Sequence, residues 1–182
     1  MEVASFAVGI VGLVVGILAL FPITLRVRRR YAWRSVLAGV KRLAPEVQRL
    51  RPDVVIGLAD GAVPAAILAL NYRVQRLYFV DAPISGRRNG GGAELCLDGL
   101  PGDLSGMRVL IIDNHVYTGS NLAEAVRQVR GRGAAEVVTM VVYRHVVAAP
   151  VAVPDHAAYD FADRLIPIPW SFSDGHKNAY IA

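Results

Sequence analysis

The stretch that decides the fold reads MRVLIIDNHVYTGSN over residues 107–121 and continues as LAEAVRQVRGRG over residues 122–133. Its aliphatic run from Val109 to Ile112 does not alternate with polar residues, which is typical of a strand buried on both faces of a parallel sheet. The second half repeats apolar residues at helical spacing and closes with two glycines. The stretch therefore predicts a buried strand that ends at Asp113 and Asn114, a short polar turn, and a helix.

The polar turn consists of Thr118, Gly119, Ser120 and Asn121. Backbone N–H groups and hydroxyls at a helix N-terminus favour an anion such as a phosphate. Asp113 comes shortly before, at the carboxyl edge of the predicted sheet, where open α/β sheets bind their ligands. It could accept hydrogen bonds from sugar hydroxyls or hold a metal ion through water. The alternative is a structural turn in which Thr118 and Ser120 only cap the helix.

These residues resemble the phosphoribosyl pyrophosphate (PRPP) loop of the type I phosphoribosyltransferases, in which an apolar strand, two acids, two mostly apolar residues and a Thr/Gly-rich turn follow one another. The resemblance implies that Asp113 and Asn114 contact the ribose and that residues 118–121 hold the 5′-phosphate. It also implies a Mg²⁺ cofactor with Asp113 as its protein ligand. Asn114 replaces the second acid. Tyr117, which joins the PRPP-binding set, stands where purine-using members often carry a carboxylate that acts on the base.

A second strand, turn and helix precede the first set. The sequence predicts a buried strand over residues 53–58 and an apolar helix over residues 63–70. The turn between them, with the Pro-Ala-Ala that follows it, resembles the family's pyrophosphate loop. The resemblance implies that pyrophosphate is bound by Ala59, Asp60, Gly61 and Ala62. Asp60 stands where a basic residue is common, so it would repel pyrophosphate unless magnesium lies between them; alternatively, Asp60 caps the helix.

Residues 81–106 lack helical periodicity and contain Arg87 and Arg88 ahead of three glycines. They resemble the family's flexible hood, which closes over the substrate and excludes water. Either arginine would then neutralise pyrophosphate in the transition state, which makes both of them, with Asp113, the catalytic candidates. A mobile surface loop is the alternative interpretation of this segment.

The last predicted strand covers residues 165–170 and ends in Pro-Trp, as in many family members that use 6-oxopurines. The resemblance implies that Trp170 stacks on the base, with Phe172 as the second candidate. The alternative for Trp170 is a core aromatic residue that closes the sheet.

The N-terminal stretch from Val3 to Leu25 carries no charged residue over 23 positions, which is long enough for one membrane-spanning helix. Four arginines follow between Arg26 and Arg30, and positive charge marks the cytoplasmic side. The pattern predicts a single-pass anchor in the cell membrane with the domain facing the cytoplasm. Gly12 and Gly16 could let two such helices pack as a homodimer, or they only face lipid.

The positive charge of this chain is concentrated in one segment near its N-terminus. Residues 26–51 hold nine basic residues against one acid, whereas the chain from residue 52 onward holds 11 basic and 13 acidic residues. A basic segment next to a membrane span favours anionic lipid headgroups, and the balance beyond it argues against nucleic acid as a partner. An apolar stripe in the same segment predicts a helix that packs on the domain, formed by Val36, Leu37, Val40, Leu43, Val47 and Leu50.

The alternation of strands and helices predicts a parallel α/β sheet. The resemblance implies that this sheet has the Rossmann-like phosphoribosyltransferase fold with a flexible hood loop. We expect a transmembrane helix over residues 1–25, a basic juxtamembrane helical connector over 26–51, and the phosphoribosyltransferase-like domain over 52–182. The implied activity is transfer of the phosphoribosyl group from PRPP to a nitrogenous base, with a purine favoured, releasing pyrophosphate. The alternative is a catalytically impaired nucleotide- or PRPP-binding or sensing domain on a membrane tether.

Overall fold

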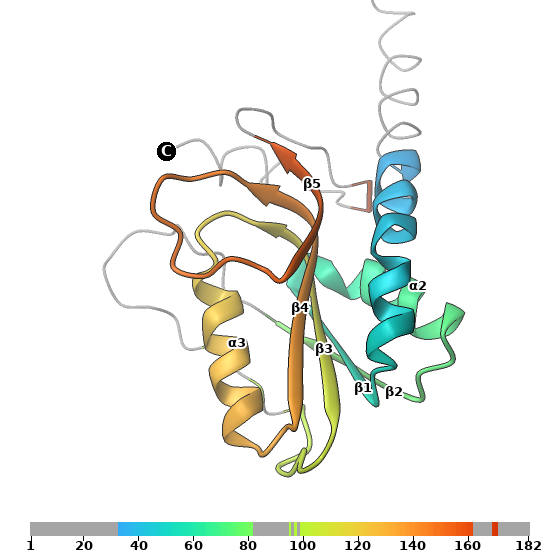
Figure 1. Ribbon diagram of the computed structural model, residues 1–182, viewed down its shortest axis with the longest axis vertical. Coiled ribbons are helices and arrows are strands. Elements are labelled where there is room, and N and C mark those ends of the chain that lie inside the picture. Colours follow the sequence, from blue (N-terminus) through green and yellow to red (C-terminus); the bar gives the residue numbers. More distant parts are fainter. Residues whose placement is uncertain (1–32, 82–94, 96, 98, 162–168, 171–182) are drawn as a thin grey trace, which may run out of the picture.

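The computed structural model describes residues 33–81, 95, 97, 99–161 and 169–170 (Figure 1). A helix covers residues 33–50 and precedes the first strand. The elements that follow are β1 (Val54–Leu58), η1 (Ala59–Gly61), α2 (Ala62–Asn71), β2 (Arg76–Val80), β3 (Arg108–Val116), α3 (Ser120–Gly131), β4 (Glu136–His145) and β5 (His156–Phe161).

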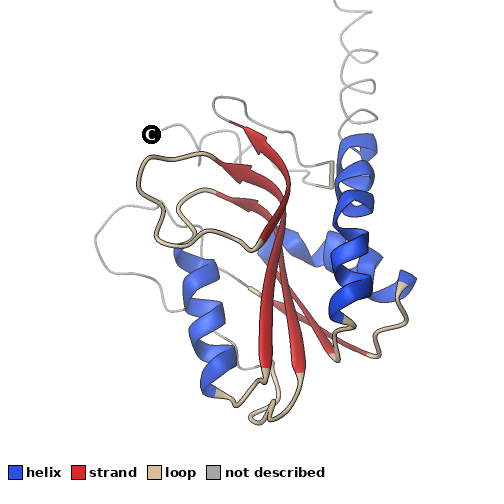
Figure 2. Cartoon of the chain, viewed as in Figure 1, coloured by secondary structure: helices blue, strands red, loops and turns tan. Residues whose placement is uncertain are grey.

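The described strands form one five-stranded sheet in the order β2-β1-β3-β4-β5, and every neighbouring pair is parallel. This confirms the parallel α/β sheet that the sequence predicts. Figure 2 shows α3 on one face of the sheet, with the 33–50 helix and α2 on the other. Because β1 and β3 lie in the middle, every residue of β1 is buried, as its unbroken apolar sequence requires.

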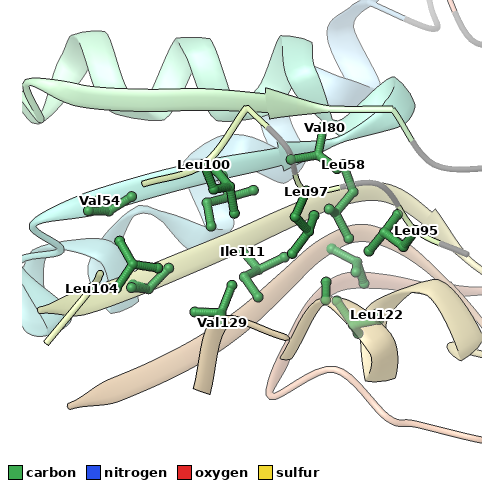
Figure 3. Packing of buried hydrophobic residues seen from close by; sticks show 14 of the residues in the cluster. Val54, Leu58, Val80, Leu95, Leu97, Leu100, Leu104, Ile111, Leu122 and Val129 are labelled. Atoms are coloured by element: carbon green, nitrogen blue, oxygen red, sulfur yellow. The ribbon is translucent and has the colours of Figure 1, made fainter. Parts of the chain in front are cut away.

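The core on the α3 side is built from alternate residues of the central strands. Val54, Ile56 and Leu58 of β1 and Ile111 of β3 pack there against Leu122 and Val129 of α3. The segment before β3 completes this core, and Figure 3 shows its leucines beside the strands: Leu95, Leu97, Leu100 and Leu104.

The core on the opposite face is closed by the 33–50 helix and α2. The predicted apolar stripe is confirmed at every position except Leu37, which is 43% exposed; the other five residues are buried. They pack with Val55, Leu110 and Ile112 of the central strands. The described part of the predicted connector is therefore a layer of the α/β core.

The 33–50 helix approaches the sheet most closely at Gly39. A Cβ atom at this position would lie 2.8 Å from a methyl group of Val142 and 2.9 Å from the ring of Tyr159. Polar contacts also attach this helix to β5, because Arg42 donates a hydrogen bond of 3.2 Å to the carbonyl of Ala158 and stacks over the Tyr159 ring at 4.4 Å. The helix is thus held against the last two strands by both packing and polar contacts.

The structure corrects one strand prediction and shows one strand that was missed, whereas residues 165–168 of the predicted last strand lie outside the described residues. The predicted strand that ended at Asp113 continues to Val116, because β4 is long enough to pair with Asp113, His115 and Val116. β5 lies at residues 156–161, a strand that the sequence analysis did not predict. Among the described residues, no helix is long and apolar enough to cross a membrane. The predicted span at residues 1–25 lies outside them.

Candidate functional site

The two loops that resemble phosphate-binding motifs meet at the carboxyl edge of β1 and β3. η1 follows β1 directly, and its Gly61 lies against the backbone of β3. A Cβ atom on Gly61 would overlap the carbonyl oxygen of Ile112 and lie 2.6 Å from Cα of Asp113. Only glycine allows this approach, so the structure brings the predicted pyrophosphate loop beside the predicted ribose-binding acid.

Asp113 is a partly buried carboxylate at this junction. Its Oδ1 accepts backbone hydrogen bonds from Asn114 at 2.6 Å and from His115 at 3.4 Å. Burial nevertheless raises the pKa of Asp113 to about 7, and the negative charge of Asp60 adds to this rise. The charge on Asp113 is therefore costly in the protein alone, and a ligand that offers hydrogen-bond donors or positive charge would stabilise it.

Asp60 is the second carboxylate at the junction, in the single turn of η1. The residue that precedes α2 is Gly61, and no side chain caps this helix, so the alternative role of Asp60 as a helix cap is wrong. Ala59, next to it, has a positive φ of 44°, which is costly for a residue with a Cβ atom. The strained turn holds Asp60 near Asp113 instead of at the helix terminus.

The pair of carboxylates fits a hard divalent cation in its chemistry. Carboxylate oxygens are preferred ligands of Mg²⁺, and a cation would relieve the repulsion between Asp60 and Asp113. Across the described ranges, no group of three or more His, Cys, Asp or Glu side chains could hold a metal ion. A Mg²⁺ ion at this junction would therefore take most of its ligands from water and from phosphate oxygens, as Mg²⁺ usually does.

Asn114 faces the interior of the protein. It is 0% exposed, and its Nδ2 lies 2.8 Å from Nδ1 of His115. Its Oδ1 is buried without a hydrogen-bond partner among the described residues. The His115 ring stacks on Tyr143 at 5.0 Å, and burial lowers the pKa of His115 to about 4. The residue predicted as the second ribose contact thus belongs to a buried, uncharged cluster behind Asp113.

The predicted phosphate turn lies between β3 and α3. Gly119 has a φ of 82° and is the residue before α3, so neither Thr118 nor Ser120 caps the helix as the alternative proposed. Their hydroxyls lie 3.0 Å apart. The carbonyl of Thr118 accepts backbone hydrogen bonds from Val151 at 2.7 Å and from Ala152 at 3.2 Å, so the β4–β5 loop fixes the turn. Asn121 follows in the first turn of α3.

Tyr117 stands between the strand and this turn with 45% of its surface exposed. Its ring contacts His145 with a centroid distance of 4.3 Å, and His145 meets Phe161 edge-on at 5.0 Å. The sequence analysis did not include His145 or Phe161 among the site residues. Both are the last residues of strands parallel to β3, and they meet Tyr117 through the register of these strands, for which the sequence offers no local signal.

Trp170 lies beside the N-terminal end of the 33–50 helix. Its ring lies 5.4 Å from that of Trp33, and it contacts the core beneath the 33–50 helix. These contacts match the core-aromatic alternative, and stacking of Trp170 on a base stays a prediction. Arg87, Arg88 and Phe172 lie outside the described residues.

An open parallel sheet with a carboxylate and a helix-terminal turn at its carboxyl edge is an α/β architecture that binds ligands at that edge. The family model of the phosphoribosyl transferase domain matches residues 29–172, which is well over half of the chain. The protein therefore belongs to the phosphoribosyl transferase domain family. No curated protein matches its sequence.

Solved structures agree with this assignment. A purine phosphoribosyltransferase from Pyrococcus horikoshii Ot3 matches with a TM-score of 0.58 and 25% identity, covering 71% of this chain and 84% of its own. A hypothetical protein from Neisseria gonorrhoeae with bound ppGpp matches with a TM-score of 0.62 and 19% identity, covering 78% and 88%. A hypoxanthine phosphoribosyltransferase from Staphylococcus aureus has a TM-score of 0.56 and 14% identity, covering 71% and 74%. The last two show a shared fold.

Proposed function

We propose that the protein is a membrane-anchored phosphoribosyltransferase that binds PRPP with Mg²⁺ and transfers the phosphoribosyl group to a nitrogenous base, with a purine favoured. The observation that carries this proposal is the contact of Gly61 with β3 at Asp113. It brings two loops of the phosphate-binding type to one carboxylate, as a ligand with a phosphate at one end and a pyrophosphate at the other requires.

Each part of the junction has a role in this reaction. Asp113 accepts hydrogen bonds from the ribose hydroxyls, the turn at Thr118 to Asn121 holds the 5′-phosphate, and the backbone of Ala59 to Ala62 holds pyrophosphate. The bond from ribosyl C1 to pyrophosphate breaks, and its electron pair leaves with pyrophosphate. A base nitrogen forms the new bond to C1 and releases its proton to water. Because C1 becomes positive as the bond breaks, the positioning of fixed charges carries much of the catalysis.

A bound Mg²⁺ would neutralise part of the pyrophosphate charge and so make it a better leaving group. Asp113 and Asp60 are the carboxylates that would hold the ion, through water or directly. With the ion present, Asp60 no longer repels pyrophosphate, which accounts for a carboxylate in a loop where a basic residue is common.

A binding or sensing domain is the second candidate, and Asn114 is the observation that favours it. The side chain at this position is neutral and 0% exposed, so the junction presents a single acid of the motif to a ribose. Such a site would bind PRPP or a nucleotide without turnover. The two candidates share the ligand and differ in whether pyrophosphate is released.

Membrane attachment is the remaining part of the proposal. The uncharged stretch at residues 3–25 and the arginines after it support a single-pass anchor with the domain on the cytoplasmic side. Protease added to sealed spheroplasts should leave the domain intact, and membranes washed with carbonate should retain the protein. Degradation of the domain would reverse the orientation, and release from washed membranes would remove the anchor.

The central experiment is titration of the full chain, in detergent, with PRPP in the presence and absence of Mg²⁺. We expect Mg²⁺-dependent binding that Asp113→Asn weakens by about tenfold or more, since hydrogen bonds to a charged group contribute about 1.5–3 kcal/mol each. The matched control is Asp103→Asn, an exposed aspartate before β3 at the opposite end of the sheet. Pyrophosphate release with a panel of bases then separates enzyme from sensor. Absence of PRPP binding would contradict the enzyme, and absence of both PRPP and nucleotide binding would contradict the sensor as well.

A further inference from the structure

The aromatic residues Tyr117, His145 and Phe161 form a group that the proposed roles leave unused. They lie at or just beyond the carboxyl ends of β3, β4 and β5, the same sheet edge that carries Asp113 and the phosphate turn. The Tyr117 and His145 rings are tilted by 39° at 4.3 Å, and the His145 and Phe161 rings meet at 83° and 5.0 Å. The three rings thus form a row in which each ring contacts the next.

Tyr117 is the exposed end of this row. Its exposure of 45% contrasts with Tyr143, a β4 aromatic that is 2% exposed. A core role therefore does not explain Tyr117, whose position immediately precedes Thr118 of the phosphate turn. The Tyr117 ring contacts His145 and is still partly exposed, so it offers a flat apolar surface to a ligand. Ligand binding would cost little conformational entropy of this side chain, because its neighbours already restrict its rotation.

Two charged side chains beside the row, Arg144 and Asp160, are paired with each other. Asp160, the carboxylate next to Phe161, is paired with Arg144 through two hydrogen bonds of 2.7 Å. Nδ1 of His145 is buried and has no hydrogen-bond partner among the described residues. A ligand at this surface would thus meet the π face of Tyr117 beside a carboxylate that is already paired. This suits a planar heteroaromatic ring better than a charged group.

We propose that Tyr117 is the stacking surface for the heteroaromatic acceptor base, with His145 and Phe161 as positioning residues that hold its ring. The proposal rests on the phosphoribosyltransferase function and assigns its base-binding position to β3–β5. Stacking uses the π face that every base has, so the surface accepts both purines and pyrimidines and favours the larger purine ring.

The test compares two ligands on the full chain in detergent: ribose 5-phosphate, which lacks a base, and nucleoside 5′-monophosphates with a guanine or a uracil. We expect the wild type to bind the nucleotides more tightly than ribose 5-phosphate, and the guanine nucleotide most tightly. Tyr117→Leu should weaken nucleotide binding by about tenfold, within the range for base stacking on an aromatic ring, and leave ribose 5-phosphate binding unchanged. Tyr117→Phe should retain nucleotide affinity.

The positioning role has its own variants. His145→Ala should weaken nucleotide binding by a smaller factor than Tyr117→Leu, and His145→Phe should restore it because the ring contact returns. Phe79→Leu is the matched control, since Phe79 is an exposed aromatic residue on the edge strand β2. It should change neither affinity.

Different results identify which proposal fails. If ribose 5-phosphate and PRPP do not bind the wild type, the proposed function is wrong. If they bind but Tyr117→Leu leaves nucleotide affinity unchanged, or weakens both ligands equally, the stacking role of Tyr117 is overturned while the proposed function stands.

Discussion

The hydroxyl of Tyr143 on β4 donates a hydrogen bond of 2.8 Å to Oγ of Ser35 on the 33–50 helix. The Tyr143 ring also stacks on His115 of β3 and on Tyr159 of β5. Burial raises the pKa of Tyr143, so the hydroxyl stays protonated and remains a donor at neutral pH. One tyrosine thus joins three neighbouring strands to the helix that precedes them in the chain.

Removing this hydrogen bond should lower the free energy of unfolding by about 1 kcal/mol. Tyr143→Phe and Ser35→Ala each remove one partner, and the double variant should be little worse than either single variant because the same bond is lost. Urea denaturation measures all three. Strict additivity of the two losses would show that the bond contributes nothing and that each change acts through packing.

Gly119→Ala should disrupt the phosphate turn. The new Cβ atom would overlap the carbonyl oxygen of Ala152 at a φ of 82°, so both sterics and backbone strain oppose it. Gly106 has a φ of 74° with nothing within 4 Å of its Cβ position, so Gly106→Ala isolates the strain, at about 1–2 kcal/mol. We expect Gly119→Ala to destabilise more than this control and to weaken PRPP binding, as measured by thermal denaturation and calorimetry.

Asp113→Asn should stabilise the protein at neutral pH while weakening PRPP binding. The folded pKa of about 7 lies above the ordinary aspartate value of 3.8, so the wild type loses stability as pH rises between these values. The variant lacks this cost, and its advantage should reach at most about 4 kcal/mol above pH 7, at about 1.4 kcal/mol per pKa unit, and vanish below pH 4. Urea denaturation from pH 4 to 8 checks this. An advantage independent of pH would contradict the pKa of Asp113.

His115→Phe should remove a loss of stability on the acid side. The folded pKa of His115 is about 4, below the ordinary histidine value of 6.5, so the unfolded chain binds its proton first as pH falls from 6.5 to 4. The wild type therefore loses stability there through His115 and gains stability through Asp113. In the phenylalanine variant only the gain remains, so stability should rise more steeply as pH falls through this window. The same denaturation series measures the change in slope.

The sequence predicted the parts of the fold that local pattern controls. The run from Val109 to Ile112 is β-branched and aliphatic, and it forms the buried first half of β3. The second half was missed because its polar residues remain in the strand only through pairing with the long β4, a relation between distant segments. β5 reads HAAYDF and lacks a clear alternation, so only its pairing with β4 makes it a strand.

The candidate site also has parts that local sequence patterns predicted and parts that they missed. Asp113 and the predicted phosphate turn lie within one short motif, so the sequence predicted them together. Asn114 has the right place in the motif, but its side chain is buried, and the local pattern did not indicate this burial. His145 and Phe161 contribute through ring contacts across parallel strands, and no spacing along the chain encodes that register.

The two backbone bonds from Val151 and Ala152 to Thr118 make the β4–β5 loop a brace for the turn. Substitutions along such a loop, other than to proline, leave its N–H groups in place, since these belong to the backbone. A deletion or insertion moves them. Among homologues and designed variants, the length of the segment between His145 and His156 should therefore track ligand binding more closely than its residue identities do. An engineer who shortens this loop alters the phosphate turn without changing any residue in it.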